Sequence, residues 1–231
     1  MADTSERGVW WPSPNFGARR LGAAPRLIVL HYTAMHSAEA ARDWLCAPTS
    51  QVSAHYLIGR QGALWHLVEE EARAWHAGAG AWGGITDVNS ASIGIEIDNP
   101  GDAPFPEPAM ARLEALLPVI MGRWRIGASG VIGHSDCAPG RKIDPGARFD
   151  WRRLALGGLA VWPEAGSDPG AGLAPLLQRA GYTADATLDA KLHAFRSRFR
   201  PGVTGAPDAT DRALLAALAA APGIDGADAD A

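Results

Sequence analysis

One continuous apolar run, Leu27–Leu30, constrains the fold more than any other stretch of this chain. Four consecutive apolar residues are typical of a central strand that is buried on both faces of a sheet. A second apolar strand is expected at Ser92–Ile97, and a short one at Gly130–Gly133. Residues Ala54–Ile58 and Ala63–Val68 flank a glycine-containing turn, and this pattern predicts a β-hairpin.

Two helices are expected to accompany these strands. Ser37 belongs to a residue type that caps helix N-termini, and it precedes Ala38–Cys46, where Trp44 and Leu45 are expected on the inner side. Apolar residues at helical spacing predict a longer amphipathic helix over Pro106–Trp124.

The segment before the first strand, residues 1–25, is rich in proline, glycine and arginine. It contains an adjacent pair of tryptophans, Trp10 and Trp11. Two neighbouring indoles are costly to leave in water, so this segment is predicted to be an extended arm packed on the domain.

The composition changes after the last strand and divides the chain. Residues 1–161, including the arm, are predicted to form one domain, and the proline- and glycine-rich stretch 162–172 a linker. Three helix candidates follow within 173–221 and predict a small three-helix domain. The tail, 222–231, has the acidic, glycine- and alanine-rich composition of a disordered segment.

Charge and apolar content exclude several classes of protein. A formal net charge of −4 gives no electrostatic basis for binding nucleic acid. No run of about 18 apolar residues is present, so no membrane span is expected, and no obligate protein partner is evident. The N-terminus lacks the apolar stretch of a signal peptide, which predicts a cytoplasmic protein, although an exported form stays open.

Residues that can carry chemistry gather in one short stretch, Gly133–Gly146, predicted to be a loop leaving a strand. His134 begins it and Asp144 lies ten residues further on, while His31 follows the central apolar run. If the two strands are neighbours, both histidines emerge at one sheet edge and the loop can return Asp144 to them. Two histidines, one aspartate and a water fit a catalytic zinc, which suggests metal-assisted hydrolysis.

Two further residues fit the roles that such a reaction needs. Glu96 interrupts an apolar strand, where an acid is expensive to bury unless it is paired or placed at a cleft. It could take a proton from water and pass it to the leaving amine. Lys142 lies two residues before Asp144 and could face the developing oxyanion. Cys137 is interpreted as a small buried residue near the site and not as a ligand.

Five segments in this order closely resemble the type 2 N-acetylmuramoyl-L-alanine amidases, a zinc family that includes AmpD-like and AmiD-like enzymes. The resemblance covers about residues 20–155. It implies an α/β fold with a central mixed sheet flanked by helices, and cleavage of the amide between the lactyl group of N-acetylmuramic acid and L-Ala of the stem peptide. The segments are Val29–Thr33, Val52–Tyr56, Ala74–Gly78, Ser92–Glu96 and Gly133–Gly146.

The resemblance also implies roles for individual residues. His31, His134 and Asp144 match the ligands of one zinc ion per chain, Glu96 the catalytic acid, and Lys142 the residue that polarises the carbonyl. Five more residues fall in motifs that line the family's groove and are candidates for substrate contact. They are Tyr32, His55, Trp75, His76 and Arg141.

The second domain and the substrate leave alternatives open. Residues 173–221 resemble a peptidoglycan-binding three-helix domain, but Arg196 stands where a glutamine is common, so this domain could serve only as a buttress. The expected substrate is a muropeptide, in particular a soluble 1,6-anhydro-muropeptide formed during wall recycling. An exported amidase acting on intact wall, a zinc hydrolase of another amide, and a recognition protein that binds peptidoglycan without cutting it are the other hypotheses.

Overall fold

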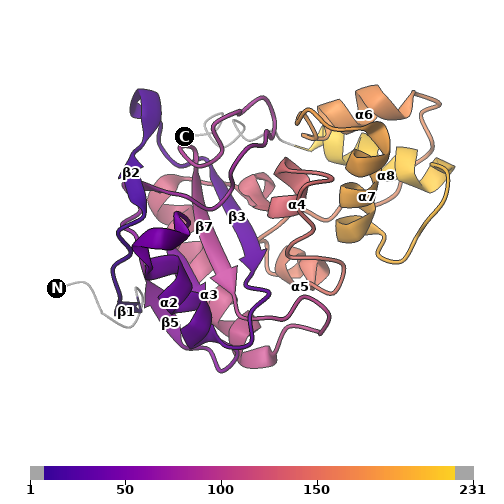
Figure 1. The fold of residues 1–231 in the computed structure, drawn as a ribbon. Helices are drawn as coiled ribbons and strands as arrows, with labels where there is room; N and C mark the ends of the chain where they lie inside the picture. The colour runs from indigo at the N-terminus through magenta and orange to yellow at the C-terminus, as the bar shows by residue number, and fades with distance from the viewer. Residues whose placement is uncertain (1–7, 222–231) are drawn as a thin grey trace.

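The structure of the chain is a computed structural model that describes residues 8–221. Its centre is a six-stranded sheet with strand order β1-β5-β4-β7-β3-β8 (Figure 1). β4 and β5 pair antiparallel, and every other neighbouring pair in this sheet is parallel. The predicted mixed sheet is therefore confirmed. Its strands are β1 (Val9–Trp10), β3 (Leu27–Tyr32), β4 (Tyr56–Ile58), β5 (Leu64–His66), β7 (Ser92–Ile97) and β8 (Val131–Gly133).

The described part of the N-terminal arm, residues 8–25, packs on the domain, as expected. β1 joins the sheet edge beside β5, and a separate two-stranded sheet forms between β2 (Phe16–Ala18) and β6 (Ala72–Ala74). The Trp10 ring contacts His66 edge-on, and the Arg42 guanidinium lies 3.9 Å from the ring centre of Trp11. Both indoles stay about half exposed.

One face of the sheet is covered by α3 (Glu107–Trp124) (Figure 1). Side chains alternate between the two faces along a strand, so Ile28 and Leu30 of β3 point to this side. They share an apolar cluster with α3 residues such as Leu113 and Ile120. α5 (Trp151–Leu156) contributes to the same cluster.

The other face carries a shorter helix. α2 (Ala38–Cys46) packs Ala41 and Leu45 on Leu57 of β4. Its N-cap is Ser37, whose hydroxyl accepts a hydrogen bond from the Ala40 backbone N–H, as predicted. Trp44 was expected on the inner side of this helix, but it is 52% exposed. One position along a helix is a rotation of about 100°, which turns Trp44 away from the inward-facing Leu45.

The C-terminal helical region consists of α6 (Leu173–Arg179), α7 (Leu188–Phe199) and α8 (Ala209–Ala220), and it lies beside the sheet next to α4 (His134–Cys137) (Figure 1). Leu27 and Val29 of β3 belong to the same buried cluster as residues of these helices and of α4, so one apolar core continues from the sheet into this region. Residues 162–172 form no helix or strand, and 222–231, predicted to be disordered, lie outside the described residues.

Four short helical segments complete the described chain. Three are 3₁₀ turns in connections, and the fourth, α4, begins at the end of β8. None of the helices formed by residues 8–221 is long and apolar enough to cross a membrane. The segments are η1 (Arg20–Gly22), η2 (Pro48–Ser50), η3 (Ala128–Gly130) and α4 (His134–Cys137).

Candidate metal centre and active site

Two neighbouring strands place an imidazole and a carboxyl side by side. In the parallel pairing of β3 with β7, His31 is the register partner of Glu96. His31 belongs to the same face of β3 as Leu27 and Val29, opposite to the face that α3 covers. Glu96 lies between Ile95 and Ile97, both of which pack on the α3 side. Its side chain therefore points to the same face as His31.

β8 delivers the second histidine beside the first. β3 and β8 are parallel with Leu30 opposite Gly133, so the chain reaches His31 and His134 at the same sheet edge, as predicted. The stretch after Gly133 was predicted to be a loop, but it opens with the helical turn α4, of which His134 is the first residue. The Asp136 carboxylate accepts a hydrogen bond from the Gly133 N–H at 2.8 Å, which stabilises the start of this turn.

The remainder of the stretch folds back on α4. The Ala138 carbonyl accepts hydrogen bonds from the backbone N–H groups of Arg141 and Lys142, which reverses the chain. The Ser135 N–H then donates to the Asp144 carbonyl at 2.9 Å. This backbone contact returns Asp144 to the histidines.

Three donor atoms converge at this point. His31 Nδ1 lies 3.0 Å from His134 Nδ1 and 2.9 Å from Asp144 Oδ2, and His134 Nδ1 lies 3.0 Å from the same oxygen. All three residues are buried. Burial and the adjacent His134 lower the pKa of His31 to about 4. Although burial acts in the opposite direction, the adjacent imidazoles of His134 and His31 hold the pKa of Asp144 below its usual range.

The hydrogen bonds made by Nε2 of His134 and by Nε2 of His31 show which nitrogen of each ring carries the proton. His134 Nε2 is 2.9 Å from the Ala77 carbonyl, which can only accept, so this nitrogen carries the proton. The Ser92 hydroxyl donates to the Val88 carbonyl at 2.5 Å and must therefore accept from His76 Nε2, at 3.1 Å. His76 Nδ1 in turn accepts from His31 Nε2 at 3.1 Å.

Both Nδ1 atoms are consequently unprotonated and face a carboxylate oxygen. Three lone-pair atoms about 3 Å apart, with no proton between them, repel one another unless a cation is shared among them. Donors of a zinc ion lie about 2.0–2.2 Å from the metal, which suits this spacing. The set His31, His134 and Asp144 therefore fits a metal ion, and within residues 8–221 no other group of histidine, cysteine and acidic side chains has this geometry.

Glu96 lies beside this set without a partner of its own. Its side chain is half-buried, and the Oε2 atom is buried with no hydrogen bond to any residue from 8 to 221. Burial, together with the nearby Asp144 charge, raises the pKa of Glu96 well above its usual value, while Lys142 opposes this shift. A carboxyl with a raised pKa, beside a candidate metal site, suits proton transfer.

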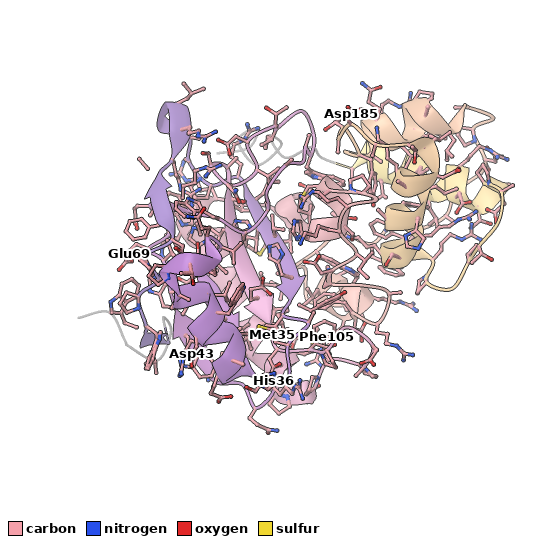
Figure 2. The ribbon with its side chains drawn as sticks, in the orientation of Figure 1. Met35, His36, Asp43, Glu69, Phe105 and Asp185 are labelled. Carbon is pink, nitrogen blue, oxygen red and sulfur yellow. The ribbon has the colours of Figure 1, made fainter. Side chains whose placement is uncertain are left out.

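A groove of about 550 Å³ opens over these residues, between α2 and the Arg141–Asp144 segment. Met35, labelled in Figure 2, lies on its wall beyond the ends of β3 and β7. The predicted residues Tyr32, Trp75, His76, Arg141 and Lys142 all line this groove. Sequence reasoning missed the wall that α2 and its neighbours provide. The unpredicted lining residues include Thr33, Met35, Trp44, Val52 and Ile143.

Three residues of the predicted site region lie away from the groove. His55 is fully buried, with Nδ1 accepting from the Gly94 N–H at 2.9 Å and Nε2 3.2 Å from the Ala72 carbonyl, which indicates a structural role in place of substrate contact. Cys137 is buried and its thiol contacts the His134 carbonyl, as its interpretation as a non-ligand requires. Asp136 points toward the C-terminal helices.

Arg141 and His76 both touch the groove, but each also supports other parts of the site. The Arg141 guanidinium donates to the carbonyls of Ala77 and Ala79 and so holds the loop that bonds to His134. His76 orients His31, and its ring lies against Gly94. A glycine within an apolar strand signals that another group approaches closely, and this signal was available from the sequence at Gly94.

A buried donor set, an unpaired acid and an open groove are together the arrangement of a metal-dependent hydrolase. The family model for N-acetylmuramoyl-L-alanine amidase matches residues 21–147 of the chain. AmiD of Escherichia coli is 36% identical, with 85% of this chain and 83% of that protein covered. The 1,6-anhydro-N-acetylmuramyl-L-alanine amidase AmpD of Enterobacter cloacae is 33% identical, with 62% and 86% covered.

Solved structures give the same result. A complex of E. coli AmiD with anhydro-N-acetylmuramic acid-L-Ala-D-γ-Glu-L-Lys superposes with a TM-score of 0.75 at 34% identity, covering 86% of this chain and 90% of AmiD. AmpDh3 of Pseudomonas aeruginosa in complex with anhydromuramic pentapeptide gives 0.75 at 32% identity, covering 86% and 92%. The chain belongs to the N-acetylmuramoyl-L-alanine amidase family and is an enzyme of that class.

Proposed function

We propose that this amidase hydrolyses the amide between N-acetylmuramic acid, in its 1,6-anhydro form, and L-Ala of the stem peptide. The observation that carries the proposal is the convergence of three unprotonated donor atoms beside Glu96 at the base of an open groove. The complexes of AmiD and AmpDh3 support the substrate, because both contain an anhydromuramyl peptide.

His31, His134 and Asp144 would hold one Zn²⁺ per chain. Zinc bound there would lower the pKa of a water molecule and polarise the scissile carbonyl. The protein's part is to keep both Nδ1 lone pairs free, and the hydrogen bonds of His31 to His76 and of His134 to Ala77 do this.

Glu96 and Lys142 would act on the substrate itself. Glu96 takes the proton of the attacking water and gives it to the leaving nitrogen of L-Ala, a role that its raised pKa suits. Lys142 is exposed on the groove wall, and its ammonium makes no hydrogen bond or ion pair with residues 8–221, so it is available to the carbonyl oxygen as negative charge develops there.

The remaining groove residues would bind the muropeptide. Tyr32 and Trp75 offer partly exposed aromatic faces, and Trp44 and Met35 supply the opposite wall. Arg141 is exposed, and we assign it two roles: it holds the Ala77–Ala79 loop by hydrogen bonds, and it binds the charged stem peptide. His76 acts mainly through His31.

Hydrolysis of a purified anhydro-muropeptide, followed by mass spectrometry with and without a chelator and beside intact sacculi, tests the proposal. Chelator-sensitive release of free stem peptide from the anhydro substrate, with sacculi cut poorly, is the expected result. Digestion of sacculi at a similar rate would favour an amidase of intact wall. Binding without cleavage of either substrate would contradict the proposal and favour the recognition protein.

Domain roles and location are also part of the proposal. We assign catalysis to residues 1–161, a connecting function to 162–172 and a helical domain to 173–221. Arg196 gives no support for glycan binding by that domain, because its side chain is buried in an ion pair with Asp211. A cytoplasmic recycling enzyme stays a prediction that substrate preference and cell fractionation would test.

A further inference from the structure

The C-terminal helical region contacts the turn that carries a proposed metal ligand. Asp136, two residues after His134, is completely buried. Its Oδ1 accepts a hydrogen bond from the Tyr182 hydroxyl at 3.0 Å, and its Oδ2 accepts one from Arg198 Nη1 at 2.7 Å. Arg198 lies on α7, and Tyr182 lies in the connection between α6 and α7.

Arg198 also contacts the chain on the other side of His134. Its Nη2 donates to the Val131 carbonyl at 3.1 Å, and its guanidinium lies 3.9 Å from the ring centre of Trp151. One side chain thus joins β8, α4 and α5. Its side chain is only 3% exposed, so the ion pair with Asp136 operates in a region of weak solvent screening.

The direction of the His134 ring depends on the turn that these contacts hold. His134 is the first residue of α4, and the Ser135 N–H is bonded to the Asp144 carbonyl. A displacement of α4 would therefore move two of the three metal donors relative to His31. Fixed donor positions are what distinguishes a tight metal site from three nearby side chains.

We propose that Arg198 and Tyr182 are positioning residues for the metal centre, acting on His134 and Asp144 through Asp136. The C-terminal domain is then a part of the catalytic unit. This inference rests on the proposed function, because it requires that His31, His134 and Asp144 bind the metal. Loss of Arg198 leaves a buried carboxylate without its cation, so α4 must shift to reach solvent or another donor.

The same helix provides a matched control. Arg196 is also buried and pairs with Asp211, and it donates to the Gly205 and Ala206 carbonyls, all within the C-terminal domain. Replacing Arg196 with methionine should destabilise this domain without touching α4. Replacing Arg198 with methionine removes an equally buried cation that does touch α4.

The zinc affinity of the full-length protein is measured by competition with a chelator of known affinity. In parallel, kcat and KM on the anhydro-muropeptide are measured at fixed free zinc. Arg198→Met should weaken zinc binding about tenfold or more, with activity restored by excess zinc. Arg196→Met should keep the affinity of the unsubstituted protein, although its urea midpoint falls. Equal zinc affinity in Arg198→Met, or an equal loss in Arg196→Met, would overturn the inference.

Two milder variants keep the test decisive if Arg198→Met does not fold. Arg198→Lys retains the charge but not the two-pronged contact, and Tyr182→Phe removes one hydrogen bond and no charge. Both should weaken zinc binding by a smaller factor, and unchanged affinity in both would overturn the inference. An unsubstituted protein that binds no zinc would instead overturn the proposed function.

Discussion

The His76 ring lies directly on Gly94, so closely that a Cβ added to Gly94 would sit 2.4 Å from His76 Cγ. Gly94 occupies the groove face of β7 between two other residues of the site. Ser92 accepts the His76 Nε2 proton, and Glu96 is the proposed acid. At intervals of two residues, one face of β7 therefore carries the hydroxyl that bonds to His76, the glycine against which the His76 ring packs, and the proposed acid.

Gly94→Ala should therefore damage the metal site although Gly94 has no functional group. The new methyl displaces His76, and with it the partner of His31 Nε2, while overpacking typically costs about 1–3 kcal/mol. We expect a lower urea midpoint together with weaker zinc binding. Gly122→Ala is the control, since Gly122 lies in α3 and a Cβ added there would point into open space. Wild-type zinc affinity in Gly94→Ala would contradict the account.

Ser92→Ala should weaken zinc binding through two hydrogen bonds. The Ser92 hydroxyl sets the direction of the bonds to His76 and His31, and without it His76 can present a proton to His31. We expect about a tenfold loss of zinc affinity by chelator competition, the low end for groups that support metal ligands. Ser13→Ala also removes a buried hydroxyl, one that donates to the Leu45 carbonyl at 2.6 Å, and should leave zinc affinity unchanged.

Glu96→Gln and Asp144→Ala should separate catalysis from metal binding. The glutamine keeps the size of the side chain but cannot transfer a proton, so kcat should fall about 10²- to 10⁴-fold with a full zinc content. Asp144→Ala removes a donor, so zinc content and activity should be lost together. Zinc content is measured by elemental analysis after dialysis. A Glu96→Gln enzyme with both zinc and normal turnover would remove Glu96 from its role.

Much of this architecture follows from local sequence. The apolar runs at Leu27–Leu30 and Ser92–Ile97 specify buried strands, and polar residues at their ends must emerge at one edge if the strands are parallel. His31, His134 and Asp144 could be grouped on that basis. Period-two alternation also places Glu96 opposite its apolar neighbours, on the groove face.

The parts that sequence reasoning missed depend on contacts between distant segments. His55 was expected at the groove, but its ring is held between Gly94 and Ala72, and no local pattern reveals this. Trp44 was expected on the inner side of its helix, but helical geometry turns it toward the groove. The pairing of Asp136 with Arg198 joins residues 62 positions apart, and a buried ion pair leaves no periodic trace.

The buried imidazoles should make the zinc-free protein sensitive to mild acid. Burial, and secondarily the Arg19 charge, lower the pKa of His55 to about 3, whereas an unfolded histidine titrates near 6.5. Between these values the unfolded chain takes up a proton that the folded chain does not. Unfolding is therefore favoured as pH falls below about 6.5, by at most about 1.4 kcal/mol per pH unit for one such group.

His55→Gln should reduce that slope, because glutamine can accept from the Gly94 N–H but does not titrate. The free energy of unfolding is measured in urea at pH 7, 6 and 5, on chelator-treated protein, for both forms. At pH 7 the variant is expected to be less stable, because the packing of the buried imidazole ring is lost. On acidification it should lose less stability than the unsubstituted protein. His193→Gln removes an exposed histidine and serves as the control. If the free energy of unfolding changes equally with pH in His55→Gln and in the unsubstituted protein, the folded state protonates His55 readily. Water would then reach the ring, which would contradict the account.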